Sequence, residues 1–318
     1  MKNRLSIDIV IVNWNSGDQL RNCLKSLSRF VGTLSVRVVV VDNASTDGSA
    51  DPLPHVSDRP VTLIRNEMNV GFGRACNQGA MASEGDLILF LNPDAEVFDG
   101  TLERVADEML ASENGRIGIL GVQLMNPDGK VERSCSRAPT LGRLAAQAIG
   151  LTKLPGLRGT GMKMLDWDHQ SSRDVEQVIG AFFVVRRSVF DALDGFDERF
   201  FVYFEEVDLS YRARLAGWRV RYLAEARAFH AGGGTSGQIK ARRLYYSLRS
   251  RLLYGFKHFP AGRAWLLVGV TLFVEPLSRS VFCLARGDVG GVANTMGGYR
   301  LLLGSLPSIL RGEGRGKA

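Results

Sequence analysis

The sequence predicts an α/β fold with a mostly parallel central sheet, and three apolar runs carry that prediction. Residues 7–12, 36–41 and 87–91 are short runs rich in valine, isoleucine and leucine, as expected of buried parallel strands. Between the first two runs, residues 18–30 carry apolar side chains at helical spacing. Strands that alternate with helices form βαβ units, whose right-handed crossovers bring the carboxyl ends of the strands to one rim. Ligands bind at that rim in open α/β sheets.

The remaining segments complete this pattern and add a helical end. Further strands are expected at 61–64, 117–124, 175–185, 219–223 and 226–230, further helices at 73–83, 102–110 and 205–216, a turn at 126–129, and a mobile loop at 150–172. From residue 239 onward the pattern is helical. We therefore expect an α/β domain at 1–238 and a basic helical extension at 239–318.

The composition is that of an ordinary globular protein from a reducing compartment. Of the 318 residues, 45% are hydrophobic and 23% are charged, which suits a folded chain with a large core. The four cysteines form no CxxC pair, so neither a zinc site nor a disulfide framework is expected. The first apolar run is short and contains Asp8, which predicts a first strand rather than a signal peptide.

The charge is distributed unevenly along the chain. The net charge is +7, and from residue 237 onward there are 13 Lys and Arg but only three acidic residues. A basic end of this kind is typical of a protein that meets an anionic surface, either a membrane or a nucleic acid.

The start of this basic end favours a membrane. Residues 240–263 combine seven basic residues with interleaved tyrosine, leucine and phenylalanine, and they contain no acid. Residues 264–274 form an apolar run of 11 residues that ends at Glu275-Pro276, whereas a bilayer span takes about 20. A basic helix with an apolar face favours contact with the interface of an anionic membrane. Helix packing or a homo-oligomer contact is the next alternative, and nucleic-acid binding is a distant third that we do not expect.

Short polar side chains follow the expected strands at the rim of the sheet. Asn13 and Asn15 follow the first strand, Asp42 follows the second, and Asp94 ends an Asn-Pro-Asp tripeptide after residues 87–91. A hard divalent cation could bridge Asp94 and the oxygens of a diphosphate. Asp42 could accept a hydrogen bond from a nucleobase or a ribose, or it could instead cap a following helix. Asn-Pro-Asp could also be only a turn.

A glycine-containing segment begins the helix expected at 73–83. Residues 69–73 read Asn-Val-Gly-Phe-Gly, and glycines at a helix N-terminus allow close approach of a phosphate. The segment is neither a GxGxxG nor a Walker sequence, so it predicts neither a dinucleotide site nor a P-loop.

Three acids and one histidine later in the chain are further candidates. Glu205, Glu206 and Asp208 begin an expected helix directly after a run of aromatic residues. They could simply favour the helix dipole, or the aromatic residues could desolvate one of them and raise its basicity for general-base catalysis. His230 ends an expected strand before the glycine-rich run 232–237, which makes it a candidate for a metal or phosphate contact.

Taken together, these motifs resemble those of family 2 glycosyltransferases with the GT-A fold, and most closely the bacterial rhamnosyltransferase-like members. The resemblance rests on Val-Asn-Trp-Asn (12–15), Val-Asp-Asn-Ala-Ser-Thr-Asp (41–47), Asn-Val-Gly-Phe-Gly (69–73), Leu-Asn-Pro-Asp (91–94), Phe-Glu-Glu-Val-Asp-Leu (204–209) and His230. Each motif is loose alone, but their order and spacing over residues 5–235 are specific. The fold it implies is a Rossmann-like, mostly parallel sheet with a C-terminal helical extension.

The resemblance also implies roles for individual residues. Asp94 and His230 would hold a divalent metal, Mg²⁺ or Mn²⁺, although Asn92 stands at the first position of the family's Asp-x-Asp motif. Glu206 would be the general base, with Glu205 and Asp208 as the neighbouring alternatives. The donor and its nucleotide would contact Val12, Asn13, Asn15, Asp42, Asn69, Gly71, Arg74, Asn92, Gly180 and Ala181.

The implied activity is inverting, metal-dependent transfer of a sugar, for example rhamnose from dTDP-rhamnose, from a nucleotide-diphosphate donor. The acceptor would be a cell-surface polysaccharide or a lipid-linked glycan. Such an enzyme would lie in the cytoplasm, peripherally at the inner face of the cytoplasmic membrane. The alternative is a non-catalytic nucleotide-sugar-binding or scaffold protein of glycan assembly, which Asn92 keeps open.

Overall fold

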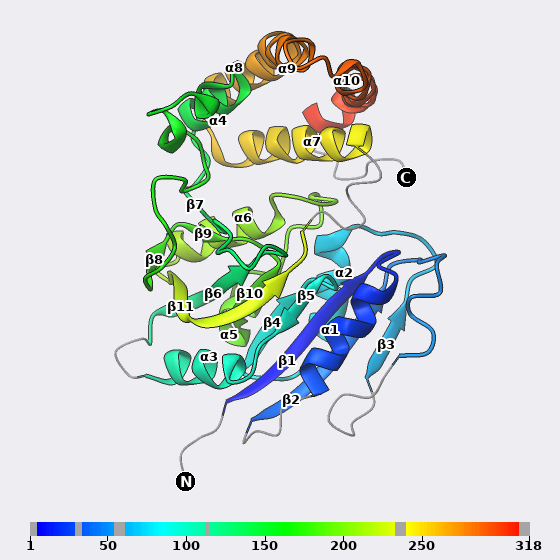
Figure 1. Cartoon of the computed structure of the whole chain (residues 1–318), viewed down its shortest axis with the longest axis vertical. Coiled ribbons are helices and arrows are strands. Elements are labelled where there is room, and N and C mark those ends of the chain that lie inside the picture. Colours follow the sequence, from blue (N-terminus) through cyan, green and yellow to red (C-terminus); the bar gives the residue numbers. More distant parts are fainter. Residues whose placement is uncertain (1–4, 29–33, 54–60, 112–114, 233–239, 312–318) are drawn as a thin grey trace. The chain divides into compact units, whose positions relative to one another are not determined.

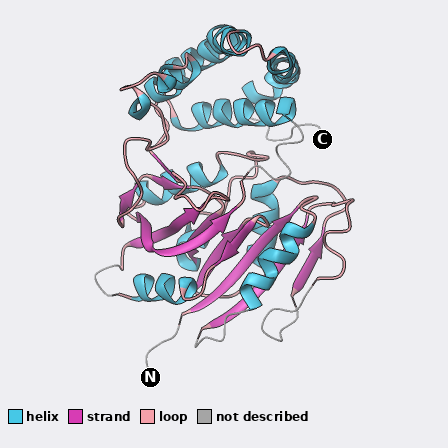
Figure 2. Ribbon diagram, viewed as in Figure 1, coloured by secondary structure: helices cyan, strands magenta, loops and turns pink. Residues whose placement is uncertain are grey.

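The computed structural model describes residues 5–28, 34–53, 61–111, 115–232 and 240–311, and the chain forms two compact units (Figures 1 and 2). The α/β unit comprises residues 1–136, 168–197 and 206–235, and the helical unit comprises 137–167, 198–205 and 236–318. The predicted boundary at 238 lies outside the described residues. Two earlier segments join the helical unit because its helices bond to them. Ser278 Oγ donates to the carbonyl of Ala148, and Ser250 Oγ donates to that of Val202.

The first half of the sheet has the predicted strands. β1 (Ser6–Asn13), β2 (Ser35–Asp42), β3 (Thr62–Arg65) and β4 (Leu87–Leu91) are parallel and lie in the order β3-β2-β1-β4. Every residue of β4 is buried. A strand covered on both faces reads as a continuous apolar run, which is why this strand was predictable to the residue.

The second half of the sheet is mixed in direction. β10 (Phe182–Arg186) runs antiparallel between β4 and β6 (Ile117–Met125), and β11 (Arg219–His230) runs parallel to β6. β5 (Ala95–Val97) and β8 (Arg173–Val175) both pair antiparallel with β11. Most strands of the sheet therefore run in one direction, as predicted, and β10, β5 and β8 run in the opposite direction.

Two strand predictions were wrong in detail. The strand expected at 175–185 is three strands, β8, β9 (Gln177–Val178) and β10, because the small residues Gly180 and Ala181 lie in a break before β10. β9 pairs with β7 (Cys135–Ser136) in a separate two-stranded sheet. The two strands expected at 219–223 and 226–230 are instead the single strand β11, with an irregularity between Leu223 and Arg227.

The helices of the α/β unit cover both faces of the sheet. α1 (Asp18–Ser28) buries Leu20 and Leu24 in the core that contains Ile9 of β1. α2 (Phe72–Met81) packs against the other face of β1, so closely that a Cβ on Gly79 would lie 2.3 Å from Val10 Cγ1. The remaining helices of this unit are α3 (Thr101–Leu110), α5 (Arg187–Ala192) and α6 (Glu205–Leu215), whose first residue belongs to the helical unit.

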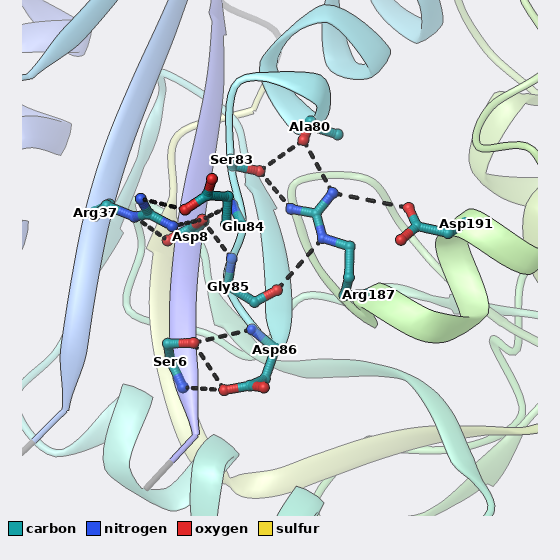
Figure 3. A network of polar contacts seen from close by, with 10 residues as sticks. All are labelled: Ser6, Asp8, Arg37, Ala80, Ser83, Glu84, Gly85, Asp86, Arg187 and Asp191. Atoms are coloured by element: carbon teal, nitrogen blue, oxygen red, sulfur yellow. Dashed lines mark hydrogen bonds and ion pairs between the residues drawn. The ribbon is translucent and has the colours of Figure 1, made fainter.

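A polar clamp fixes the turn between α2 and β4 (Figure 3). The buried Asp8 carboxylate accepts the backbone N–H groups of Glu84 and Gly85, each at 2.6 Å, and the guanidinium of Arg37 at 3.1 Å. On the other side of the turn, Arg187 donates to the carbonyl of Ala80 and to Ser83 Oγ. Because β4 begins directly after this turn, the clamp sets the register of the strand that leads to Asp94.

The segment expected to be a mobile loop at 150–172 contains two short 3-10 helices, η2 (Leu151–Lys153) and η3 (Arg158–Thr160). The fully buried His169 lies near its end. The carbonyl of His169 accepts Gln123 Nε2 and the Tyr222 hydroxyl, each at 2.9 Å. These bonds tie this end of the segment to β6 and β11.

The helical unit consists of helices α4, α7, α8, α9 and α10, the π-helical turn η5, and the 3-10 helices η2 and η3 (Figure 2). Their bounds are α4 (Leu141–Ala148), α7 (Lys240–His258), α8 (Ala261–Gly269), η5 (Val270–Val274), α9 (Glu275–Leu284) and α10 (Val289–Leu310). The helix that carries the apolar run does not end at Glu275-Pro276, because proline is tolerated in the first turn of α9 and the helix continues. Within the described residues, Ala261–Leu284 is one helix with the length and hydropathy of a membrane span.

The prediction that the basic helix after residue 239 is amphipathic was wrong for its middle. Every residue from 248 to 255 of α7 is buried. Arg249 Nη1 donates to the carbonyl of Arg199 at 3.0 Å, and Arg251 Nη2 donates to Thr271 Oγ1 at 2.9 Å and pairs with Glu275. The middle of α7 is therefore core of the helical unit, where buried partners accept hydrogen bonds from two arginines that the sequence pattern placed at a surface.

Candidate active site

The structure brings Asp94 and His230 together through a short antiparallel pairing. Ala95 of β5 lies opposite His230 of β11, and the N–H of Ala231 donates to the carbonyl of Asp94 at 3.0 Å. This register places Asp94 Oδ1 3.5 Å from His230 Nε2, with the two side chains 11% and 10% exposed. One small ion could therefore contact both of these atoms. The glycine-rich run after His230 falls largely outside the described residues.

Glu132 holds the other nitrogen of His230, a contact that the sequence did not predict. Glu132 Oε2 lies 2.9 Å from His230 Nδ1, and the Glu132 N–H donates to the carbonyl of Leu124 at 2.7 Å. Burial lowers the pKa of His230, but the Glu132 bond and the Asp94 charge outweigh it, so the pKa is raised. The only sequence signal was the turn predicted at 126–129, which returns the chain alongside β6.

This arrangement has the chemistry of a two-ligand metal site. Among the residues that the structure describes, no three His, Cys, Asp or Glu side chains form a metal-binding cluster. Asp94 and Nε2 of His230 face each other, while Glu132 lies at the opposite ring nitrogen. Such a carboxylate fixes the tautomer and orientation of a histidine that ligates a metal through its other nitrogen.

Asn92 contributes through its backbone. Its N–H donates to the carbonyl of Ala181 at 3.0 Å, and its carbonyl accepts the N–H of Ala95 at 3.1 Å. The Asn-Pro-Asp tripeptide is therefore a turn, as one interpretation predicted, and the same turn directs Asp94 toward His230.

Asp42 and Asn13 form a buried polar pair at the ends of β1 and β2. Asn13 Nδ2 donates to Asp42 Oδ1 at 2.8 Å, and Asp42 is 4% exposed. The alternative that Asp42 caps a helix was wrong, because residues 43–53 contain none. Its Oδ2 instead accepts the N–H of Ser45 at 3.4 Å, which closes a turn.

Other residues predicted to contact the sugar donor lie in the loop after β1, before and at the start of α2, and in β1. Asn15 Oδ1 accepts the N–H of Thr46 at 2.7 Å. Asn69 Oδ1 accepts the N–H of Gly71 at 3.0 Å, and Gly71 has the positive φ of 92° that turns the chain into α2. Arg74 is exposed on the first turn of α2, whereas Val12 is buried in β1.

Glu206 is linked to the Asp94 region through the break before β10. A Cβ on Gly180 would lie 4.0 Å from Glu206 Cγ, and the next residue, Ala181, accepts the N–H of Asn92. Glu206 Oε1 accepts Gln177 Nε2 at 3.4 Å, while its Oε2 is enclosed and has no hydrogen-bond partner. Burial raises the pKa of Glu206 to about 7. Gln177, like Glu132, was missed by the sequence analysis.

The other two acids of the motif have different surroundings. Asp208 is fully buried, and its Oδ2 accepts Arg212 Nε at 2.7 Å. Arg212 also donates to the carbonyls of Leu193 and Gly195, so the pair ties α6 to the turn after α5. Glu205 is buried and is the last residue of its segment in the helical unit. Of the three acids, Glu206 is the one that adjoins the break before β10, so it stays the first candidate for the base, with Glu205 as the alternative.

The backbone before α6 is strained and is held within the helical unit. Tyr203 and Phe204 have positive φ values of 68° and 71°, which bulky side chains rarely adopt. α7 supports this segment through the Ser250 bond to the carbonyl of Val202 at 2.9 Å, and the rings of Phe204 and Tyr254 are 5.5 Å apart. Local strain of this kind is concentrated at functional sites in proteins.

A mixed sheet of this order, with a carboxylate and a histidine at strand ends, is the GT-A architecture of a glycosyltransferase. The chain belongs to the family described as Glycosyl transferase family 2, which residues 8–193 match. It is 32% identical over 260 residues to N-acetylglucosaminyl-diphospho-decaprenol L-rhamnosyltransferase of Mycobacterium tuberculosis, covering 78% of this chain and 83% of that protein. It is also 25% identical to the low-salt glycan biosynthesis hexosyltransferase Agl10 of Haloferax volcanii, covering 78% and 74%.

Solved structures share the fold at low sequence identity. The mannosyltransferase PcManGT of Pyrobaculum calidifontis, in complex with GDP-Man and Mn²⁺, matches 98% of this chain and 86% of its own with a TM-score of 0.54 and 15% identity. TarS 1-349 of S. aureus in complex with UDP-GlcNAc matches 96% and 92% with a TM-score of 0.54 and 14% identity. The predicted family, fold and enzyme class are confirmed.

Proposed function

We propose that this glycosyltransferase transfers a hexose, with inversion, from a nucleoside-diphosphate donor held at Asp94 and His230 to a hydroxyl deprotonated by Glu206. The observation that carries this proposal is the 3.5 Å approach of Asp94 Oδ1 to His230 Nε2. Both residues belong to the α/β unit, as does Glu206.

Asp94 and His230 are suited to hold a divalent cation, Mg²⁺ or Mn²⁺. One hard and one borderline ligand leave most positions open, and diphosphate oxygens can fill them. A bound cation supplies charge that offsets the negative charge developing on the leaving diphosphate. Glu132 keeps Nε2 of His230 turned toward Asp94 by accepting the proton on Nδ1. PcManGT was crystallised with GDP-Man and Mn²⁺, which supports use of a divalent metal here.

Glu206 is suited to act as the general base. Its pKa of about 7 leaves a large ionised fraction near neutral pH while keeping the carboxylate basic. It accepts the proton of the acceptor hydroxyl as that oxygen forms a bond to the anomeric carbon. The bond from that carbon to the diphosphate oxygen breaks on the opposite face, and the diphosphate takes the bonding electrons. This single displacement inverts the anomeric configuration.

We assign the nucleotide of the donor to the rim formed by Asn13, Asn15, Asp42 and Asn69. The relative from M. tuberculosis supports rhamnose as the transferred sugar and a polyprenyl-diphosphate-linked glycan as the acceptor. With such an acceptor, the enzyme works peripherally at the inner, anionic face of the cytoplasmic membrane, alone or as a homo-oligomer.

Transfer by the purified full-length protein tests this proposal. We expect turnover of dTDP-rhamnose with a lipid-linked N-acetylglucosamine acceptor and added Mn²⁺ or Mg²⁺, and NMR of the product should show the inverted anomer. Glu206→Gln should abolish transfer while the donor still raises the melting temperature. The melting temperature measured with dTDP, UDP or GDP and each metal identifies the nucleotide, because the nucleotide that binds raises it most.

The absence of an acid at Asn92 supports the alternative of a nucleotide-sugar-binding protein without catalysis. That alternative predicts the same melting-temperature shifts, but neither transfer nor hydrolysis of any donor in the panel.

A further inference from the structure

One long helix of the helical unit leaves an apolar stripe uncovered. Ala261–Leu284 comprises 24 residues, a length of about 36 Å at the rise of an α-helix. Leu266, Phe273, Leu277, Val281 and Leu284 are each more than half exposed. They recur every three, four or seven residues, so they lie on one face of the helix. Five large apolar side chains in water on one face mark an interaction surface.

A second stripe runs along α10. Its members Val289, Met296, Leu303 and Leu310 are exposed and follow one another at intervals of seven residues, which again places them on one face. α10 packs against α9 and α7 within the helical unit. The helical unit therefore exposes apolar side chains from two helices that touch.

Two polar side chains of Ala261–Leu284, those of Thr271 and Glu275, are buried in the unit. Its only carboxylate is that of Glu275, which is 1% exposed and pairs with Arg251 of α7 and with Arg279. Thr271 is fully buried and accepts Arg251. A helix with one protein-bound side and one apolar, open side has the geometry of helices that lie in the plane of a membrane interface.

The charged residues around the two apolar stripes indicate what this surface binds. Arg263, Arg286 and Arg311 are exposed at or near the ends of these helices, and Arg300 is exposed in the middle of α10. Among the described residues of 240–311 the only exposed acid is Asp288. An apolar surface bordered by cations complements an anionic lipid bilayer, in which acyl chains take the apolar side chains and headgroups take the guanidinium groups.

We propose that the surface formed by Ala261–Leu284 and α10, the docking face, inserts into the interface of an anionic membrane. The sequence pattern predicted that role for the basic helix α7, but the middle of α7 is core of the helical unit. Only the role of this binding rests on the proposed function: it would keep the enzyme at the membrane that holds a lipid-linked acceptor.

Vesicle binding by the full-length protein tests the proposal. Sedimentation with phosphatidylcholine vesicles containing phosphatidylglycerol should pull down the wild-type protein. The triple variant Phe273→Ser, Leu277→Ser, Val281→Ser should have an affinity at least about a hundredfold lower, because it no longer buries three large apolar side chains in the membrane. The matched control replaces three equally exposed residues of the α/β unit, Met68, Met81 and Leu215, with serine and should bind as the wild type does.

Two further measurements test the electrostatic contribution to binding and the direct contact with lipid. Arg263→Glu with Arg286→Glu should weaken binding to the anionic vesicles by about fivefold or more per residue and should leave weak binding to pure phosphatidylcholine unchanged. Trp265, which is exposed on α8, should shift its emission to the blue on binding and be quenched by brominated lipids, and Trp265→Phe should remove that quenching.

The outcomes are distinct from those that test the transferase. Unchanged vesicle binding by the triple variant, or Trp265 emission that vesicles leave untouched, overturns the docking face. A second outcome also overturns it: the wild-type protein does not bind vesicles, and sedimentation velocity shows that it is a dimer whereas the triple variant is a monomer. In that case a second copy of the chain covers the face. Nucleotide-induced melting shifts should be equal in the wild-type protein and the triple variant, so a failed donor site is recognised independently.

Discussion

Replacing Glu132 with alanine removes the carboxylate that lies 2.9 Å from Nδ1 of His230. The imidazole then loses the partner that fixes its tautomer and its rotation, so Nε2 is no longer held toward Asp94, 3.5 Å away. Loss of such a partner weakens metal binding by about 10- to 100-fold, or roughly 1.4 to 2.7 kcal/mol. We expect that loss in the affinity for Mn²⁺ measured in the presence of a nucleoside diphosphate.

The assay is an electron paramagnetic resonance titration of free Mn²⁺, which needs no turnover. It is run at about pH 8.5, well above the ordinary histidine pKa of ~6.5. This matters because Glu132 raises the pKa of His230. Its removal therefore also favours the neutral ring that binds metal, an effect of opposite sign that would mask the loss at low pH.

Two variants sharpen the test. Glu132→Gln keeps an oxygen that can accept the Nδ1 proton, so it should stay within about threefold of the wild-type affinity. Asp128→Ala removes an exposed carboxylate from the same hairpin and should change nothing. Wild-type affinity in Glu132→Ala would refute the reasoning, and an equal loss in Glu132→Gln would show that charge, rather than orientation, is what Glu132 supplies.

Three further substitutions probe the base and the packing. Because only ionised Glu206 accepts a proton, kcat/KM should rise with pH through an inflection near 7, and Glu206→Gln should abolish transfer. The raised pKa also means that ionisation destabilises the fold as pH rises through 7, so Glu206→Gln should increase the free energy of unfolding by roughly 1 to 3 kcal/mol at about pH 8.5 in urea titrations. Asp208→Asn should destabilise the fold by about 3 kcal/mol in the same titration, because it leaves Arg212 without its buried partner. Gly79→Ala should cost about 1 to 3 kcal/mol, since its Cβ would lie 2.3 Å from Val10 Cγ1; a wild-type urea midpoint would show that α2 can move away from β1.

Three of the first four strands were predictable because β4 is buried at every residue and β1 and β2 at most of theirs, so each reads as an apolar run. β3, at the edge of the sheet, is partly exposed and gives only a short apolar run. β5 was not predicted, since three residues carry no periodicity, yet its pairing with β11 is what brings Asp94 to His230. The sequence therefore indicated the two candidate ligands but not the pairing that joins them. Glu132 was missed for a similar reason, because its place beside His230 depends on a hairpin that returns along β6.

The largest difference between prediction and structure concerns the C-terminal helices. The sequence of α7 has the alternation of basic and aromatic residues that is typical of a membrane-surface helix. In the structure, the carbonyl of Arg199 accepts a hydrogen bond from Arg249, and Thr271 and Glu275 bind the guanidinium of Arg251. Such partners are distant in sequence, so charge patterning alone cannot reveal that an arginine is buried.

The position of a bound metal tests the central claim most directly. Crystals of the protein grown with Mn²⁺ and a nucleoside diphosphate should give an anomalous peak about 2.0 to 2.2 Å from both a carboxylate oxygen of Asp94 and Nε2 of His230. A peak that contacts the diphosphate but neither side chain, or a metal held at another place on the rim, would contradict the account.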